Sequence, residues 1–199
     1  MTPRALLFDL GGVLVEVDWN RAFAAWSRHS GTPARVLAGR FRRDASYEAH
    51  ECGTLDDGGF FAHLRASLHV DIDDAAMLEG WNAILGDPFP GVPALLRRLP
   101  IPAYVFSNTN VAHAAHWRPK YRDLLHPVRE VFVSCEIGAR KPNPEAFGRV
   151  VERIGIAPAH VAFFDDLEDN VAGARAAGLS AFHVPSPGVL ADAVEMALS

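Results

Sequence analysis

The sequence predicts an α/β protein with a doubly wound parallel sheet and a helical cap inserted after the first strand. Short apolar runs recur along the chain, helical patterns separate them, and one connection between strands is far longer than the others. Strands that alternate with helices form parallel sheets covered on both faces. The expected core is therefore Rossmann-like.

The strands are expected where about four apolar residues follow one another almost without interruption. Such runs are typical of buried parallel strands, because helices cover both faces of the sheet. The segments that fit this pattern are 5–8, 103–106, 131–133, 161–164 and 181–184.

The helices of the core are marked by their ends and by apolar stripes. Pro144 follows Asn143 at a favourable first helical position, and the apolar stripe that begins there stops before Gly155. Gly178 ends another helix in the same way. Further core helices are predicted over 94–99, 167–177 and 189–198.

The connection between the first two predicted strands is much longer than the others. It spans more than ninety residues, whereas a crossover needs about a dozen. Helical patterns begin near Asp18, near Thr32–Pro33 and after Thr54. Thr54 and Asp57 form a loose capping box for the third of these helices. A fourth helix is expected to hold Met77, Leu78, Trp81 and Leu85.

These patterns divide the chain into two predicted domains. Residues 16–90 form a helical cap, and residues 1–15 together with 91–199 form the Rossmann-like core. Within the cap, we interpret His50–Glu51 as a surface turn that precedes Gly53.

Composition and charge argue against nucleic acid and membrane as partners of this protein. The formal net charge is −5, and we interpret the densest basic run, Arg40–Phe41–Arg42–Arg43, as a solvated helix end. A nucleic-acid-binding protein would carry a basic face, so no nucleic-acid partner is expected. The apolar runs fall far short of the ~18–20 residues of a membrane span, so we expect no membrane contact and a cytoplasmic location. The composition does not indicate an oligomeric state.

The cysteines do not indicate a metal site or a disulfide framework. The chain has two, Cys52 and Cys135, and they form no CxxC pair. Cysteine-based zinc sites and disulfide frameworks show cysteines in characteristic spacings, which are absent from this sequence.

Polar residues follow four of the predicted strands at the point where each strand ends. In open α/β sheets, ligands bind outside the carboxyl ends of the strands, so these side chains are expected to converge. They are Asp9, Gly11 and Gly12 after the first strand, Ser107 and Asn108 after the second, Arg140 and Lys141 after the third, and Asp165 and Asp166 at the fourth.

This set of residues is suited to phosphoryl chemistry. An Asp carboxylate such as Asp9 can attack phosphorus and form an aspartyl-phosphate. Mg²⁺ favours one or two carboxylates together with phosphate oxygens, and Asp9 and Asp166 could supply them, with the Gly11 carbonyl as a further ligand. Lys141 could offset the repulsion between carboxylate and phosphate, and the Ser107 hydroxyl could hold phosphate oxygens. Each residue also has an ordinary structural role, so the prediction depends on their joint order.

The segments that carry these residues resemble the four motifs of the haloacid dehalogenase superfamily, whose members are mostly phosphatases. Residues 8–14, 105–110, 140–142 and 163–170 look like its first to fourth motifs, in the family's order. The resemblance covers nearly the whole chain and implies a Rossmann-like core, a helical cap and a Mg²⁺ cofactor. It is greatest to bacterial α-D-glucose-1-phosphate phosphatases, which implies a small sugar phosphate such as glucose 1-phosphate as substrate.

The resemblance also implies a role for each site residue. Asp9 would be both nucleophile and metal ligand, and Asp166 would be the second metal-binding carboxylate. Asp165 would lie behind the metal or reach it through water. The phosphate would be held by Ser107, Asn108 and Lys141.

One position departs from the family pattern. Most phosphatases of this family carry an Asp two residues after the nucleophile, where it acts as general acid and base, but this chain has Gly11. Loss of such a group costs about 10²–10⁴-fold in rate. Relatives resembling glucose-1-phosphatase share this Gly. Candidates for a replacement are Glu16, Asp18, His50, Glu51 and His113.

Two other functions remain open because of this departure. One is a metal-independent 2-haloacid dehalogenase, in which Asp9 would attack carbon and displace halide. The other is a protein that binds a phosphate ligand without turnover. The adjacent carboxylates Asp165 and Asp166 favour a metal, and therefore a phosphatase.

Overall fold

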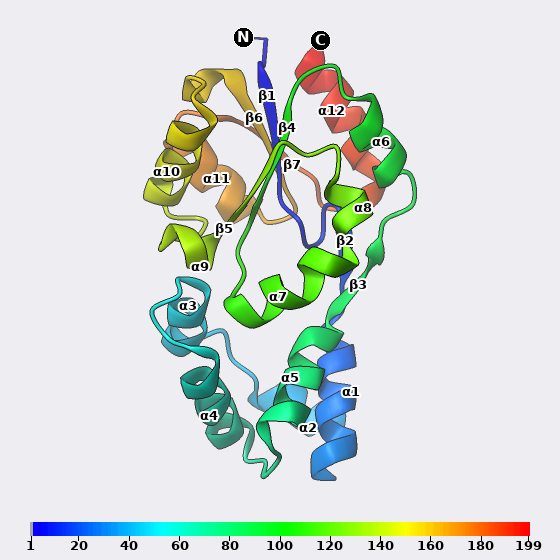
Figure 1. The fold of residues 1–199 in the computed structure, drawn as a ribbon, viewed down its shortest axis with the longest axis vertical. Helices are drawn as coiled ribbons and strands as arrows, with labels where there is room; N and C mark the ends of the chain where they lie inside the picture. The colour runs from blue at the N-terminus through cyan, green and yellow to red at the C-terminus, as the bar shows by residue number, and fades with distance from the viewer. Residues whose placement is uncertain (1) are drawn as a thin grey trace.

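A five-stranded parallel sheet forms the centre of the structure, a computed structural model that describes residues 2–199 (Figure 1). The strand order is β5–β4–β1–β6–β7, and Phe8 of β1 lies opposite Val105 of β4 and Phe164 of β6. The predicted strands are confirmed to within one residue at each end. Their bounds are Ala5–Phe8 (β1), Ala103–Ser107 (β4), Glu130–Val133 (β5), Val161–Asp165 (β6) and Ser180–His183 (β7).

Helices cover both faces of this sheet, as the doubly wound prediction requires. Side chains of β1 alternate between the faces, with Leu6 and Phe8 in one core cluster and Ala5 and Leu7 in the other. One face is covered by α6 (Val92–Arg98), α7 (Val111–Lys120), α8 (Arg122–Leu125) and α12 (Leu190–Leu198). The other is covered by α9 (Ser134–Ile137), α10 (Pro144–Ile154) and α11 (Glu168–Ala176).

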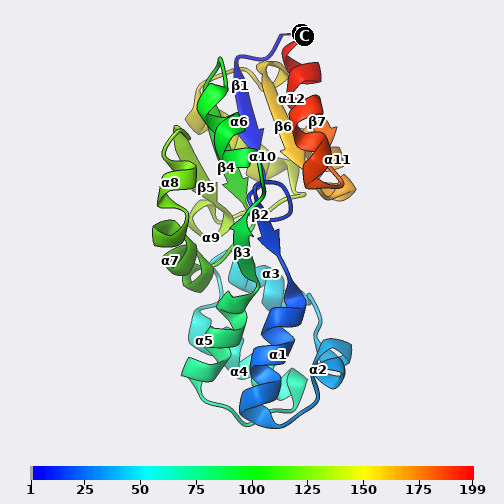
Figure 2. The same cartoon turned by 90° about the vertical axis from the view of Figure 1, so that its right-hand side faces the viewer.

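The long segment between β1 and β4 forms a helical layer beyond the carboxyl ends of the strands (Figures 1 and 2). Its helices pack around a core of their own, and Asp side chains cap four of them. They are α1 (Trp19–Ser30), α2 (Ala34–Arg40), α3 (Ala45–Glu51), α4 (Asp57–Leu68) and α5 (Asp74–Ala83). A two-stranded antiparallel sheet, β2 (Val15–Val17) and β3 (Leu85–Pro88), joins this layer to the core (Figure 2).

Three predictions about this segment are wrong. His50–Glu51 is not a surface turn: both residues are buried at the end of α3, where the His50 ring stacks on Phe60 at 4.1 Å. Thr54 does not cap α4, because its hydroxyl donates to a carbonyl of the preceding helix and Asp56 caps α4 instead. Leu85 lies in β3 rather than in α5.

No helix within residues 2–199 combines the length and the apolar character that a membrane span requires.

Candidate active site

A cavity of about 290 Å³ lies between the carboxyl edge of the sheet and the helical layer. The loops after β1, β4 and β6 form its floor, because the carboxyl ends of neighbouring parallel strands meet at one edge. The predicted site residues on its wall are Asp9, Gly11, Ser107, Asn108 and Asp166. Lys141 and Asp165 are buried beside them, and Lys141 contacts Asp9.

Asp9 lies directly after β1, where its backbone N–H donates to the Phe164 carbonyl at 2.9 Å. Its Oδ1 lies 2.9 Å from the Lys141 ammonium and accepts from the Leu10 N–H. Within residues 2–199, Oδ2 accepts no hydrogen bond. Burial raises the pKa of Asp9 to about 8, Lys141 opposes this shift, and the Asp165 carboxylate adds to it.

Asp165 holds Lys141 in place. Its Oδ2 lies 2.7 Å from the Lys141 ammonium, and its Oδ1 accepts from the Leu167 N–H and the Asn170 amide, each at 2.9 Å. Burial lowers the pKa of Lys141, but the Asp165 and Asp9 carboxylates outweigh burial and raise it, so the ammonium stays charged. Because Asp165 is fully buried and each of its oxygens has a partner, it orients its neighbours.

Asp166 has a different environment from Asp165. It is half-buried on the cavity wall, and within residues 2–199 its carboxylate makes no hydrogen bond or ion pair. Burial raises its pKa, and the Asp165 carboxylate raises it further. Gly12, at φ +81°, passes close beside it: a Cβ there would lie 2.5 Å from Asp166 Oδ2. Only glycine fits this position comfortably.

The acidic cluster fits a divalent cation. One carboxylate oxygen from each of Asp9, Asp165 and Asp166 lies within 4.8 Å of the others. The Lys141 ammonium pairs with Asp9 and Asp165, but burial and the repulsion between the carboxylates still raise the pKa values of Asp9 and Asp166. Carboxylate oxygens are the ligands that Mg²⁺ prefers, and a cation would relieve the repulsion.

The loop after β4 supports the Lys141 loop. The Asn108 amide brackets the Lys141 backbone, donating to its carbonyl and accepting from its N–H, both at 2.9 Å. Ser134, which the sequence did not indicate, bonds both the N–H and the carbonyl of Thr109 at 2.9 Å. The Ser107 hydroxyl, on the cavity wall, makes a long 3.5 Å contact to the Asn108 carbonyl.

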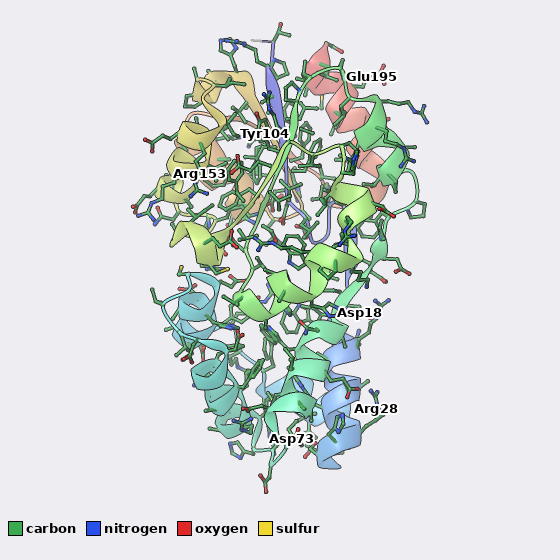
Figure 3. All side chains as sticks on the ribbon, in the orientation of Figure 1. Asp18, Arg28, Asp73, Tyr104, Arg153 and Glu195 are labelled. Carbon is green, nitrogen blue, oxygen red and sulfur yellow. The ribbon has the colours of Figure 1, made fainter. Side chains whose placement is uncertain are left out.

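The structure leaves little room for an acidic side chain at position 11. A Cβ at this position would lie 2.9 Å from Val17 Cγ2, so β2 occupies the room that a side chain would need. Three of the proposed replacements do not line the cavity. Glu16 pairs with Arg21, Asp18 caps α1 (Figure 3), and His50 pairs with Asp57.

The two remaining candidates line the cavity but are engaged. His113 Nε2 bonds the Trp81 carbonyl at 2.8 Å, and Nδ1 faces the Asn110 amide at 3.2 Å. Burial lowers the pKa of His113 to about 3, so this ring carries no spare proton near neutral pH. The Glu51 carboxylate is paired with Arg140 at 2.7 Å.

One residue of the basic run 40–43 also reaches the cavity. Arg42 and Arg43 are both exposed, as expected, but Arg43 lies on the cavity wall, with its guanidinium 5.4 Å from the Trp19 ring. Because α2 ends at Arg40, the chain turns back toward the sheet and carries Arg43 with it. Helical periodicity could not show this turn.

Comparison with known proteins identifies the family. A model of haloacid dehalogenase-like hydrolases matches residues 3–178. The chain belongs to this family. It is therefore a hydrolase of the haloacid dehalogenase-like type.

Relatives of this hydrolase include named phosphatases. Phosphatase MT3486 of Mycobacterium tuberculosis is 30% identical over 207 residues, which cover 100% of this chain and 95% of the relative. Hexitol phosphatase A of Escherichia coli is 30% identical over 195 residues, covering 94% and 85%.

Solved structures of haloacid dehalogenase-like enzymes share the fold. An enzyme from Bacteroides thetaiotaomicron, in complex with magnesium and inorganic phosphate, aligns with a TM-score of 0.77 at 28% identity and covers 91% of this chain and 93% of its own. L-2-haloacid dehalogenase from Xanthobacter autotrophicus aligns with a TM-score of 0.71 at 22% identity, covering 92% and 78%. The second likeness concerns the fold alone.

Proposed function

We propose that this hydrolase is a Mg²⁺-dependent phosphatase that cleaves a small phosphomonoester through an aspartyl-phosphate on Asp9. The observation that carries the proposal is the buried group of Asp9, Asp165, Asp166 and Lys141 at the floor of the cavity. The phosphatase relatives, and the related enzyme that binds magnesium and inorganic phosphate, support it.

The reaction proceeds in two displacements at phosphorus. A carboxylate oxygen of Asp9 attacks, the new O–P bond forms, and the bond from phosphorus to the ester oxygen breaks. The leaving alkoxide takes a proton from water. Water then attacks the aspartyl-phosphate at phosphorus, which releases inorganic phosphate and restores the Asp9 carboxylate.

Asp9, Asp166 and the Gly11 carbonyl would hold the metal. When bound, Mg²⁺ supplies positive charge that offsets the repulsion between carboxylate and phosphate. Asp165 would not bind the metal itself. Its carboxylate accepts from the Lys141 ammonium and so holds this ammonium beside Asp9. The phosphate oxygens would be held by the Ser107 hydroxyl, the Asn108 backbone N–H and Lys141.

The substrate we propose is a sugar phosphate, such as glucose 1-phosphate. A cavity of about 290 Å³ is at the small end of ligand pockets. An anomeric phosphate suits a site whose wall lacks the usual acid, because its leaving group departs more easily than a simple alkoxide. The half-buried Trp19 ring on the wall could stack against a sugar ring.

Residues 16–90 would act as a cap that closes over the substrate and excludes water. Residues 1–15 and 91–199 would carry the chemistry. The cytoplasmic location stays a prediction.

The test is phosphate release from a panel of sugar phosphates and phosphoglycolate, with Mg²⁺, with EDTA, and with Asp9→Asn. Release that requires both Mg²⁺ and Asp9 is the expected result, and the ranking of substrates tests the preference for glucose 1-phosphate. If no member of the panel were hydrolysed while 2-haloacids lost halide in EDTA, the protein would be a dehalogenase. Phosphate binding without any turnover would indicate a binding protein.

A further inference from the structure

One guanidinium of the core binds two carboxylates of the helical layer. Arg140 Nε lies 2.7 Å from Glu51 Oε2, and its Nη1 lies 3.0 Å from Glu48 Oε1. Both glutamates belong to α3, while Arg140 belongs to the loop between α9 and α10. These contacts join segments about ninety residues apart in the sequence, across the edge of the cavity.

The two glutamates differ sharply in burial. The Glu51 side chain is 6% exposed, whereas the Glu48 side chain is 59% exposed and Arg140 is 23% exposed. A buried carboxylate without its cation is strongly unfavourable, but an exposed ion pair contributes little. Of the two contacts, the one to Glu51 therefore contributes more to holding α3 against the core.

The core side of this contact is firmly held. Arg140 precedes Lys141, whose backbone is bracketed by the Asn108 amide and whose ammonium bonds Asp9 and Asp165. When the helical layer and the core move apart, α3 is therefore expected to move while the loop of Arg140 stays in place.

We propose that Arg140 is a positioning residue that holds α3 closed over the cavity through the buried Glu51 carboxylate. In the closed arrangement the guanidinium compensates the desolvated carboxylate. When α3 moves away, both groups gain water, so the native pair can open without leaving a buried charge unpaired. Without Arg140 the buried Glu51 carboxylate of the closed arrangement keeps only the weaker stabilisation from Tyr47 and Arg43, and the equilibrium shifts toward the open arrangement.

The chain carries native reporters of this movement. Cys52 directly follows Glu51 at the end of α3, and Cys135 lies on α9. The two segments are in close contact, because a Cβ on Gly53 would lie 2.5 Å from the Cys135 carbonyl oxygen. Both thiols are half-buried, and burial raises the pKa of each. Arg140 lowers the pKa of Cys52 and Glu48 raises it, whereas the pKa of Cys135 is shifted by burial, Glu136 and Arg118, so Cys135 is the cleaner reporter.

The test is the rate at which iodoacetamide alkylates Cys135 in metal-free protein, followed by peptide mass spectrometry. Arg140→Gln is expected to raise this rate about 5–10-fold, because Cys135 is already half-buried rather than fully shielded and gains exposure when α3 moves away. Glu48→Gln is the matched control: it removes the exposed partner of the same guanidinium and is expected to change the Cys135 rate less than about twofold.

A double variant separates this role from general destabilisation. Arg140→Gln with Glu51→Gln leaves no uncompensated charge, so its Cys135 alkylation rate should return toward that of the wild type. Circular dichroism must show the same folded content in every variant, and Arg140→Lys replaces Arg140→Gln if the latter does not fold. Unchanged rates in the single variant, or rates in the double variant as high as in the single one, would overturn the proposal.

The measurement does not require turnover. If the phosphatase activity proposed above were absent, the alkylation rates would still decide the role of Arg140. If the enzyme is active, Arg140→Gln should raise KM for the preferred sugar phosphate more than it lowers kcat, because closure precedes the chemistry.

Discussion

Asp165 and Asp166 are adjacent in the sequence, but only the substitution of Asp165 by Asn should destabilise the metal-free protein. Asp165 is fully buried, and its oxygens receive three hydrogen bonds, two at Oδ1 and one from Lys141 at Oδ2. Asp165→Asn keeps the shape but replaces one acceptor oxygen by an NH₂ donor. Either orientation of the new amide places this donor against an existing donor.

The expected loss follows from these contacts. A buried donor left without an acceptor costs about 1–3 kcal/mol. The Lys141 ammonium keeps Asp9 as a partner, which limits the loss below the ~3–5 kcal/mol of a fully broken buried pair. We therefore expect Asp165→Asn to lower the free energy of unfolding by about 2–4 kcal/mol. In a protein of this length that corresponds to a Tm decrease of roughly 4–16 °C.

Thermal or urea unfolding in EDTA measures this difference without any assumption about catalysis. Asp166→Asn is the control, because the Asp166 carboxylate makes no hydrogen bond within residues 2–199 and lies beside a like charge. This control should be neutral or stabilising in metal-free protein. Equal destabilisation by the two substitutions would refute the assignment of their roles.

Two further predictions concern glycine geometry and pH. Gly12→Ala should weaken Mg²⁺ binding at least tenfold and lower Tm, because its Cβ would displace Asp166 and the residue would be held at φ +81°. The control is Gly148→Ala on α10, where a Cβ meets open space. This substitution should instead raise the free energy of unfolding by about 0.5–1 kcal/mol. Because the pKa of Asp9 rises from about 4 in the unfolded chain to about 8 in the fold, the folded state binds more protons in this range. Metal-free protein should therefore lose stability as pH increases from about 4 to about 8. Asp9→Asn, or saturating Mg²⁺, should reduce this loss in chemical denaturation at several pH values.

The floor of the site could be predicted from the sequence because its residues follow from local patterns. Buried parallel strands are continuous apolar runs, and the carboxyl ends of such strands meet at one edge. Asp9, Ser107 and Asp166 could therefore be placed together without knowledge of any tertiary contact. The same reasoning explains why the strand bounds agree to within one residue.

The cap side of the site could not be predicted in this way. Glu51 was interpreted as part of a surface turn, since the sequence gives no sign that its partner is Arg140, eighty-nine residues away. Ser134 supports the loop after β4 through a contact that exists only after the strands align. Polar residues near Gly usually indicate exposed turns, and only tertiary packing shows which of them are buried.

The central claim is that Asp9 carries the phosphoryl group during turnover. Rapid quenching of the enzyme with its best substrate and Mg²⁺, followed by borohydride trapping and peptide mass spectrometry, tests it most directly. Borohydride reduces an aspartyl-phosphate to the alcohol homoserine with loss of phosphate, so homoserine should replace Asp9 when Mg²⁺ is present and should not form in EDTA or in Asp9→Asn. Phosphate release by Asp9→Asn at the wild-type rate, or reduction at another residue instead of Asp9, would contradict the claim.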